Sequence, residues 1–277
     1  MEQKGMTASS SSSNNNNNPK KSATVAKKGK VYICGAGPGD PGLITVRAME
    51  LVKSCDVILY DRLVGQGIVD QFPQDAEKVY VGRAVGDPTT HQKRTNELMV
   101  RYAREGRSVL RLKGGDPFVY GRGAEEAEYL LEHGIGFEIV PGITSAIAAP
   151  AYAGIPLTHR RHSSSVAIVT GHEGEDGNKG DTAINWKKLS GAVDTIVVLM
   201  GIGQIGQIAR DLERGGMKKS TKVAVIESGT TEKQRVFPCT LGTVAAVVER
   251  NGVRPPAIVV IGRVAGLHKK IGWFTGA

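Results

Sequence analysis

The apolar residues in the first half of the chain form short runs, separated by glycine-rich turns and by segments of helical spacing. The runs predict strands at residues 31–34, 57–60, 79–81, 108–113 and 137–140, and the helical spacing predicts helices at 43–53, 96–104, 125–132 and 144–153. The strand segments are apolar throughout and do not alternate with polar positions. Such runs are typical of a parallel sheet whose two faces are both covered by helices.

The alternation of strands and helices restarts in the second half of the chain. We expect strands at 166–170, 195–200, 222–227, 235–238 and 257–261, and helices at 205–214 and 244–250. The segment 154–165 is the predicted linker. The predicted fold class is therefore α/β, with two α/β domains of similar size, an N-terminal one over 30–156 and a C-terminal one over 157–277. Ligands of such folds bind beyond the carboxyl ends of the strands, often at a domain interface.

Residues 1–29 differ in composition from everything that follows. The stretch TASSSSSNNNNN at 7–18 cannot bury apolar surface, so we expect a disordered tail. The tail has no apolar signal-peptide core, and the three cysteines form no C-x-x-C pair, which favours a cytoplasmic protein. A plastid is the alternative location if the serine-rich tail is part of a targeting peptide. No apolar run approaches the ~18 residues of a membrane helix, so we expect no membrane partner.

The net charge of +9 would fit a nucleic-acid-binding protein, but much of it lies in the tail. Residues 1–30 hold six lysines against the single acid Glu2, and aromatic residues make up only 5% of the chain, too few for a base-stacking surface. We therefore expect no nucleic acid as partner. No spacing of His, Cys, Asp and Glu makes a convincing metal site, so we expect no metal.

Two glycine-rich turns carry the candidate chemistry. GAGPGD at 35–40 is close to a dinucleotide fingerprint, but Asp40 replaces its third glycine and Pro38 lacks a backbone N–H. A dinucleotide-binding oxidoreductase and a plain tight turn remain alternatives for this segment. In KGGDPF at 113–118, Asp116 can accept a ribose hydroxyl or an amine, with an Asp-Pro turn as the alternative. Two such turns at strand ends favour a cationic or neutral nucleoside as ligand.

Several longer motifs, in order, carry a resemblance. They are GAGPGDPGLIT, VLRLKGGDPFVYGRGAEE, VPGITSAIAAPAYAGIPLTHR, TGH at 170–172, LMG at 199–201 and ESGTTEKQR at 227–235. Over residues 31–265 the chain resembles the tetrapyrrole (precorrin) methylase family. The third motif by itself, with its very small residues, would more often indicate helix packing than binding.

The resemblance implies S-adenosyl-methionine as methyl donor, a homodimer, and two α/β domains with the active site between them. It implies methylation of two pyrrole carbons of uroporphyrinogen III, giving precorrin-2 for siroheme and, in some organisms, cobalamin; methylation at another ring position is the alternative. Carried over by motif, the cofactor-binding residues are Pro38, Gly114, Gly115, Asp116, Val119, Thr144, Ser145, Met200 and Gly229. Only about 30 residues precede the first predicted strand, so we expect no second enzyme and accumulation of precorrin-2.

The resemblance also places Asp61 and Arg83 at the reaction. Asp61 is the expected base that removes a pyrrole proton, with a helix N-cap as its alternative role. Arg83 stands where some relatives have a lysine proton donor; because arginine stays charged, we interpret it as binding a substrate carboxylate. The substrate carries several carboxylates, so basic residues are expected to bind it: Arg62, Lys113, Arg122 and Arg160, with Arg161 beside them. We interpret His159 and His172 as hydrogen-bonding residues.

Overall fold

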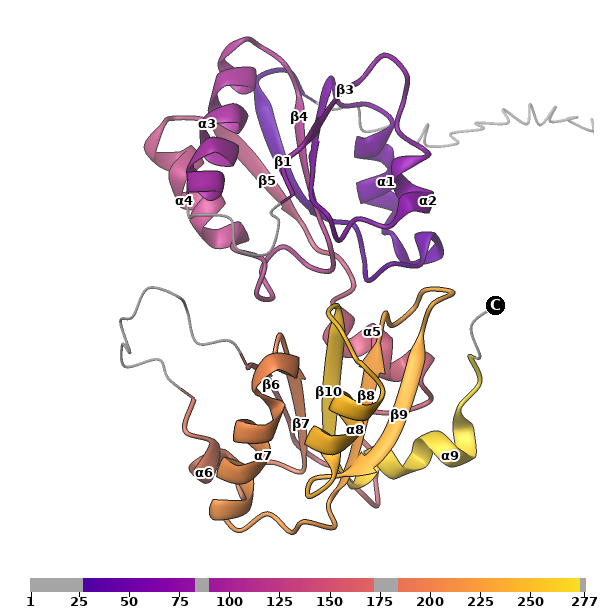
Figure 1. Cartoon of the computed structure of the whole chain (residues 1–277). Helices are drawn as coiled ribbons and strands as arrows, with labels where there is room; N and C mark the ends of the chain where they lie inside the picture. Colours follow the sequence, from indigo (N-terminus) through magenta and orange to yellow (C-terminus); the bar gives the residue numbers. More distant parts are fainter. Residues whose placement is uncertain (1–26, 83–89, 172–183, 275–277) are drawn as a thin grey trace, which may run out of the picture.

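The computed structural model describes residues 27–82, 90–171 and 184–274, which form two domains stacked end to end (Figure 1). Each domain is built on one five-stranded sheet flanked by helices. The predicted fold class is thus confirmed. Most of the predicted disordered tail lies outside the described residues. No helix within the described ranges is long and apolar enough to cross a membrane.

The first sheet is wholly parallel, with strand order β3-β2-β4-β1-β5. Its strands are β1 (Lys30–Gly35), β2 (Val57–Tyr60), β3 (Glu77–Tyr80), β4 (Val109–Lys113) and β5 (Gly136–Val140). Because all five run the same way, the turns that follow β1, β2, β4 and β5 gather at one edge of the sheet. This is the edge that faces the second domain in Figure 1.

Helices cover both faces of this sheet, as the uninterrupted apolar strands predicted. The short helix η1 (Pro41–Leu43), α1 (Val46–Val52) and α2 (Gln66–Val69) lie on one side, and α3 (Thr90–Arg104) and α4 (Gly123–Glu132) lie on the other. Successive strand residues point to opposite faces. Leu110 and Leu112 of β4 accordingly pack in the same cluster as α1 and α2, whereas Val109 packs with α3 and α4.

The second sheet is mixed, which its apolar runs did not indicate. Its order is β6-β7-β10-β8-β9, made by β6 (Val166–Thr170), β7 (Thr195–Leu199), β8 (Lys222–Glu227), β9 (Arg235–Thr240) and β10 (Ala257–Gly262). Only β6 and β7 pair in parallel; β10 is antiparallel to β7 and β8, and β8 is antiparallel to β9. The segment 228–234 that joins β8 to β9 is too short for a helical crossover, so the two strands form a hairpin.

The second sheet is also covered on both faces. On one side lie α6 (Trp186–Leu189), α7 (Ile205–Arg214) and α8 (Val244–Arg250), with η2 (Ile202–Gln204) leading into α7; η3 (Arg263–Leu267) and α9 (His268–Ile271) follow β10. The other face packs against α5 (Ser145–Tyr152), through Ala146 and Ala149. The predicted N-terminal domain included α5. Its packing favours a division of the chain between β5 and α5, upstream of the predicted linker.

Candidate active site

Three turns of the first domain touch backbone to backbone at the edge that faces the second domain. The N–H of Gly37 donates to the carbonyl of Gly115 at 3.2 Å, and Gly115 donates back to Gly37 at 2.7 Å. A Cβ on Gly35 would lie 2.4 Å from the Gly115 oxygen and 2.6 Å from Cα of Gly142. We call the contact of Gly35, Gly115 and Gly142 the glycine seam. Only glycine permits this approach, which joins the turns after β1, β4 and β5.

Asp116 fastens the turn after β4 to the turn after β5. Its Oδ1 accepts a hydrogen bond from the N–H of Phe118 at 2.8 Å, and its Oδ2 accepts one from the N–H of Gly142 at 3.0 Å. The side chain therefore makes the Asp turn that was the alternative interpretation. An ionised carboxylate has about four lone-pair sites, so two of them remain for a ligand. A cofactor contact of Asp116 stays a prediction.

Asp61 lies directly beyond β2 and is not a helix N-cap. The N-cap position of α2 is Gly65, whereas Oδ1 of Asp61 accepts from the N–H of Leu63 at 3.0 Å, forming a local Asx turn. The other oxygen, Oδ2, is 3.7 Å from Nη2 of Arg111, and the side chain is 23% exposed. The N-cap alternative is thus wrong for this residue, and its carboxylate stays accessible at the strand end.

Strained backbone is concentrated in the loops at the facing ends of the two domains. All non-glycine residues with positive φ in the described ranges lie in three loops: Tyr120 and Arg122 after β4, Met200 after β7, and Ser228 and Thr230 after β8. Such conformations cost about 1–3 kcal/mol each and cluster at ligand and active sites. Their distribution therefore marks this junction as the candidate site.

Hydrogen bonds join the two domains across this junction. The N–H of Asp40 donates to Oγ1 of Thr230 at 3.3 Å, and the hydroxyl of Tyr152 donates to Oδ2 of Asp40 at 2.6 Å. The bond to Asp40 raises the pKa of Tyr152 to about 12, so the phenol remains a donor at neutral pH. Tyr120 reaches across as well, since its hydroxyl donates to the carbonyl of Ile168 at 3.0 Å.

The cofactor-binding candidates lie in the turns on the two sides of this junction. From the first domain come Pro38, Gly114, Gly115, Asp116 and Val119, and from the second come Met200 and Gly229, with Thr144 and Ser145 on the crossing segment. Thr144 is the N-cap of α5 and accepts from the N–H of Ala146. A Cβ on Gly229 would lie 2.3 Å from that of Ala149, so this loop must lie tightly on α5.

The exposed surface at these turns suits a nucleoside-bearing ligand. Phe118 is 56% exposed, Met200 is 53% exposed and Ile143 is 36% exposed, although large apolar side chains are usually covered. Backbone turns without Cβ atoms lie beside them. The residues present thus fit S-adenosyl-methionine. Nowhere in 27–82, 90–171 and 184–274 do three His, Cys, Asp or Glu side chains group in a way that could hold a metal ion.

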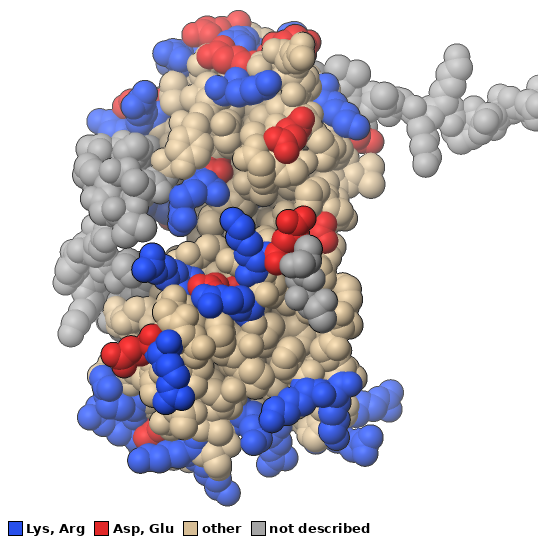
Figure 2. Space-filling model, turned by 45° about the vertical axis from the view of Figure 1, so that its right-hand side comes forward, with Lys and Arg blue, Asp and Glu red and all other residues tan. Residues whose placement is uncertain are grey.

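The basic candidates separate into exposed and buried side chains. Arg62 and Arg122 are exposed in the loops after β2 and β4, and Figure 2 shows Lys and Arg side chains beside the junction of the domains. Arg160 is exposed as well, but its turn is held at the amino end of β7, where Oγ of Ser163 lies 2.8 Å from Oγ1 of Thr195. That end of the sheet is opposite the junction, so the placement of Arg160 does not agree with substrate binding there.

Lys113 differs: its side chain is 5% exposed, and its Nζ lies 2.8 Å from Oε1 of Glu126. Burial, together with Arg111, lowers the pKa of Lys113. The prediction that Lys113 binds substrate does not agree with this placement. Arg83 and His172 lie outside the described residues.

Sequence reasoning missed Arg111 and Glu126, which are both buried beside Lys113. A signal for them existed. Two basic residues spaced by two in an otherwise apolar strand must point to the same face of the sheet. An acid within the apolar stripe of the next helix is their natural partner.

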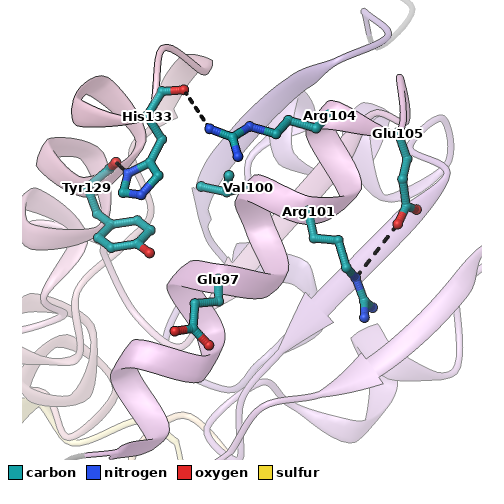
Figure 3. Close-up of a pocket in the computed structure, with 7 residues that line it drawn as sticks. All are labelled: Glu97, Val100, Arg101, Arg104, Glu105, Tyr129 and His133. Carbon is teal, nitrogen blue, oxygen red and sulfur yellow. Dashed lines mark hydrogen bonds and ion pairs between the residues drawn. The ribbon is translucent and has the colours of Figure 1, made fainter.

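A groove between α3 and α4 lies away from these turns (Figure 3). It has a volume of about 450 Å³ and is lined by Glu97, Val100, Arg101, Arg104, Glu105, Tyr129 and His133. These residues lie toward the carboxyl ends of the two helices. In a parallel α/β unit those helix ends lie over the amino ends of the strands, opposite the edge where ligands bind.

The sequence from Lys30 to Ala245 matches the family model described as "Tetrapyrrole (Corrin/Porphyrin) Methylases". The chain belongs to the tetrapyrrole methylase family. It is 50% identical over 244 residues to the "S-adenosyl-L-methionine-dependent uroporphyrinogen III methyltransferase" of Methanosarcina barkeri, covering 88% of this chain and 95% of that protein. It is 49% identical to the "Uroporphyrinogen-III C-methyltransferase" of Bacillus subtilis, covering 89% and 95%. Both matches confirm the family resemblance.

Longer proteins and solved structures of the family are similar too. The chain is 46% identical to the "Siroheme synthase" of Nitrosomonas europaea, covering 89% of this chain but 51% of that protein. A structure of the Thermus thermophilus uroporphyrin-III C-methyltransferase complexed with S-adenosyl-homocysteine has 40% identity and a TM-score of 0.72, over 85% of this chain and 92% of that one. A cobalt precorrin-4 methyltransferase has 29% identity and a TM-score of 0.75, over 86% and 96%.

Proposed function

We propose that this family member is an S-adenosyl-methionine-dependent C-methyltransferase that converts uroporphyrinogen III to precorrin-2 by two successive methylations. The observation that carries the proposal is the match, at 50% identity over 95% of its length, to a relative of that activity. The product would supply siroheme and, in some organisms, cobalamin. The longer siroheme synthases are spanned only by half, so their whole activity is not carried over.

The turns around the glycine seam would hold the methyl donor. Gly114, Gly115 and Asp116 would bind it from the first domain, with Pro38 and Val119 beside them. Thr144, Ser145, Met200 and Gly229 would close on it from the crossing segment and the second domain. Bound S-adenosyl-methionine supplies an electrophilic methyl group.

The protein's main contribution is alignment. Fixing two reactants in line can be worth ~7–11 kcal/mol of the barrier. The two domains present their turns to one junction, so donor and pyrrole can be held from opposite sides. The exposed guanidinium groups of Arg62 and Arg122 would bind the substrate's carboxylates, in the bidentate geometry that arginine favours.

C-methylation leaves the pyrrole ring cationic, and Asp61 would accept the proton that this ring must lose. Its carboxylate lies at a strand end on the ligand-binding edge, is accessible, and is oriented by the N–H of Leu63 at 3.0 Å. Carboxylates in such positions contribute typically ~10²–10⁴-fold as general bases. Arg83, outside the described residues, would bind a further substrate carboxylate.

Incubation of the purified protein with uroporphyrinogen III and S-adenosyl-methionine, followed by mass analysis, tests the function. We expect a product carrying two added methyl groups, and none when the methyl donor is omitted. A single methyl group, or methylation only of an already methylated precorrin, would indicate action at another ring position. Thermal unfolding separates the protein classes: S-adenosyl-homocysteine should raise the melting temperature, whereas NADP and oligonucleotides should not.

We infer a homodimer from the family resemblance, and a cytoplasmic location from the cysteine pattern and the absence of an apolar signal-peptide core, with a plastid as the alternative location. Light scattering on the purified protein tests the oligomeric state, and a tagged full-length chain tests the location.

A further inference from the structure

A layer of buried charges lies between the first sheet and helices α3 and α4. On this face of the sheet, strand residues such as Val109 pack against the two helices in an apolar cluster. Toward the carboxyl ends of the strands, charged side chains replace the apolar ones in this layer. Arg111 and Lys113 follow Val109 on the same face of β4, and Glu126 stands in the buried stripe of α4.

Glu126 is the centre of this layer. Its Oε1 accepts hydrogen bonds from Nε of Arg111 at 3.1 Å, Nζ of Lys113 at 2.8 Å and Nε2 of Gln92 at 3.1 Å. The Glu126 side chain is 0% exposed, and those of Arg111 and Lys113 are 6% and 5% exposed. Oε2 of Glu126 is buried and has no hydrogen-bond partner among the described residues. Three donors therefore share one oxygen atom.

Arg111 connects this centre to the candidate base. Its Nε bonds Glu126, its Nη1 donates to the carbonyl of Leu112 at 3.2 Å, and its Nη2 lies 3.7 Å from Oδ2 of Asp61. Each nitrogen of the planar guanidinium thus has its own neighbour. Asp61 continues β2 on the same side of the sheet as Leu59, whose register partner on β4 is Arg111. The guanidinium therefore spans the space between α4 and the end of β2.

The charges balance only as a group. Arg111 and Lys113 supply two positive charges, and Glu126 and Asp61 supply two negative ones. Burial alone would raise the pKa of Glu126, but the two neighbouring cations outweigh it and hold that pKa below its ordinary value. Glu126 is therefore ionised at neutral pH. Without its charge, Asp61 alone would balance the two buried cations, and Nε of Arg111 would lose the anionic acceptor that fixes the plane of the guanidinium.

We propose that Glu126 is a positioning residue for the methylation reaction: it holds Arg111 so that the guanidinium orients the carboxylate of Asp61. The inference rests on the proposed function of Asp61 as proton acceptor. Well-packed apolar side chains would serve stability as well as a buried ion cluster does. Among the described residues of this face, the buried charges lie only where its apolar core ends beside Asp61, and this location agrees with a role in positioning the Asp61 carboxylate.

A double-mutant cycle tests this role. Glu126→Gln keeps the shape of the side chain and removes its charge, and the exposed Glu128→Gln on the same helix is the matched control. In single-turnover methylation we expect Glu126→Gln to lose roughly 10-fold or more, as with other groups that orient a reacting side chain. The affinity for S-adenosyl-homocysteine should change less than about 2-fold, and the control should match the wild type.

The Asp61→Asn background separates positioning from general support of the fold. If Glu126 acts through Asp61, adding Glu126→Gln to Asp61→Asn should change the residual rate by less than about 2-fold. An equal loss in both backgrounds, or no loss in either, would overturn the proposal. Should Glu126→Gln fail to fold, Arg111→Lys replaces it in the cycle, because lysine keeps the charge and loses the planar fork.

Failure of the proposed function is visible in the same experiment. A wild type that binds S-adenosyl-homocysteine but methylates no uroporphyrinogen overturns the function. The cycle is then read by thermal unfolding of the same four proteins. Non-additive shifts in melting temperature would support the Asp61–Arg111–Glu126 coupling, and additive shifts would overturn it.

Discussion

The two domains bury different kinds of side chain against their sheets. In the second domain both clusters are apolar: α6, α7 and α8 cover one face and α5 covers the other. In the first domain the cluster under α3 and α4 ends in Arg111, Lys113 and Glu126 at the carboxyl edge of the sheet. Buried charges are costly. Among the described residues of the second domain Glu227 on β8 is also buried, but its partner Arg235 is half exposed, whereas Arg111, Lys113 and Glu126 are all buried together. This cluster lies beside Asp61, the proposed base, and so agrees with the proposal that the first domain carries the proton chemistry.

The loops of the two domains differ in a complementary way. Those of the first domain meet through glycine backbone and present carboxylates, namely Asp61 and Asp116. Those of the second domain present Met200 and Gly229 on strained or tightly packed turns. At the junction, the second domain thus contributes backbone and apolar side chains, and the first domain contributes the carboxylates.

The largest expected effect comes from the candidate base. Asp61→Asn should lose ~10²–10⁴-fold in turnover, because the amide still accepts the bond from Leu63 but cannot take a proton. The fold and S-adenosyl-homocysteine affinity should be unchanged. Rapid-quench methylation and calorimetry on the same preparation measure both. Normal turnover with normal binding would remove Asp61 from the reaction and weaken the assignment of chemistry to the first domain.

A cavity in the second domain should affect stability and leave the chemistry intact. Leu212 of α7 is 0% exposed within the apolar cluster. Leu212→Ala should reduce the unfolding free energy by about 2–5 kcal/mol. Chemical denaturation measures this loss, and single-turnover methylation at low temperature should give the wild-type rate per folded molecule. If the methylation rate per folded molecule fell as well, the second domain would take a more direct part in the reaction.

Asp116 should contribute less, through the turns that it fastens. Asp116→Ala leaves the N–H groups of Phe118 and Gly142 without their acceptor and would remove the proposed charge-assisted contact to the cofactor. We expect S-adenosyl-methionine binding to weaken by about 1.5–3 kcal/mol, measured by calorimetry. Asp116→Asn keeps an acceptor for one of the two N–H groups and should lose less. If the alanine variant bound as tightly as the wild type, Asp116 would be a turn residue alone.

The smallest expected effect is the acid response of the first sheet. Oδ2 of Asp56 accepts from the N–H of Ser108 at 2.7 Å and from its hydroxyl at 2.6 Å. Burial alone would raise the pKa of Asp56, but the bonds from Lys28 and Ser108 lower it from 3.8 to about 2. Because the folded-state pKa is depressed, its stabilisation is complete above pH 3.8 and is lost as pH falls toward 2.

We expect this loss to be about 1–2 kcal/mol after allowance for solvent screening. Unfolding at pH 5 and pH 2.5 should show it in the wild type and not in Asp56→Asn. Asp194→Asn in the second domain is the comparison variant. Hydrogen bonds from Ser164 lower the pKa of Asp194 too, but Asp194 is exposed, so this variant should remove less of the acid response than Asp56→Asn. If Asp56→Asn and Asp194→Asn lost the same unfolding free energy between pH 5 and pH 2.5, Asp56 would not be the source of the expected loss.

Much of this organisation could be predicted from the sequence. Uninterrupted apolar strands indicated the parallel first sheet, and glycines at strand ends marked the turns that form the glycine seam. The direction of β10 could not be predicted, because a strand buried on both faces has the same composition in either direction. Lys113 was misjudged for a related reason: a basic residue at a strand end resembles a ligand contact until its partner on α4 is known.

Helix α5 limits where recombination between relatives can join the two halves of this protein. Its sequence follows the first sheet directly, yet its alanines complete the core of the second. A second half beginning at the predicted linker would leave the faces of Val197, Ala224 and Val260 bare. The halves therefore cannot be exchanged between relatives as independent cassettes at that point. A crossover between two relatives would have to lie between β5 and α5, beside Gly142 of the glycine seam. A stable chimera would therefore take the second domain together with α5 and with Thr144 and Ser145 at the start of that helix.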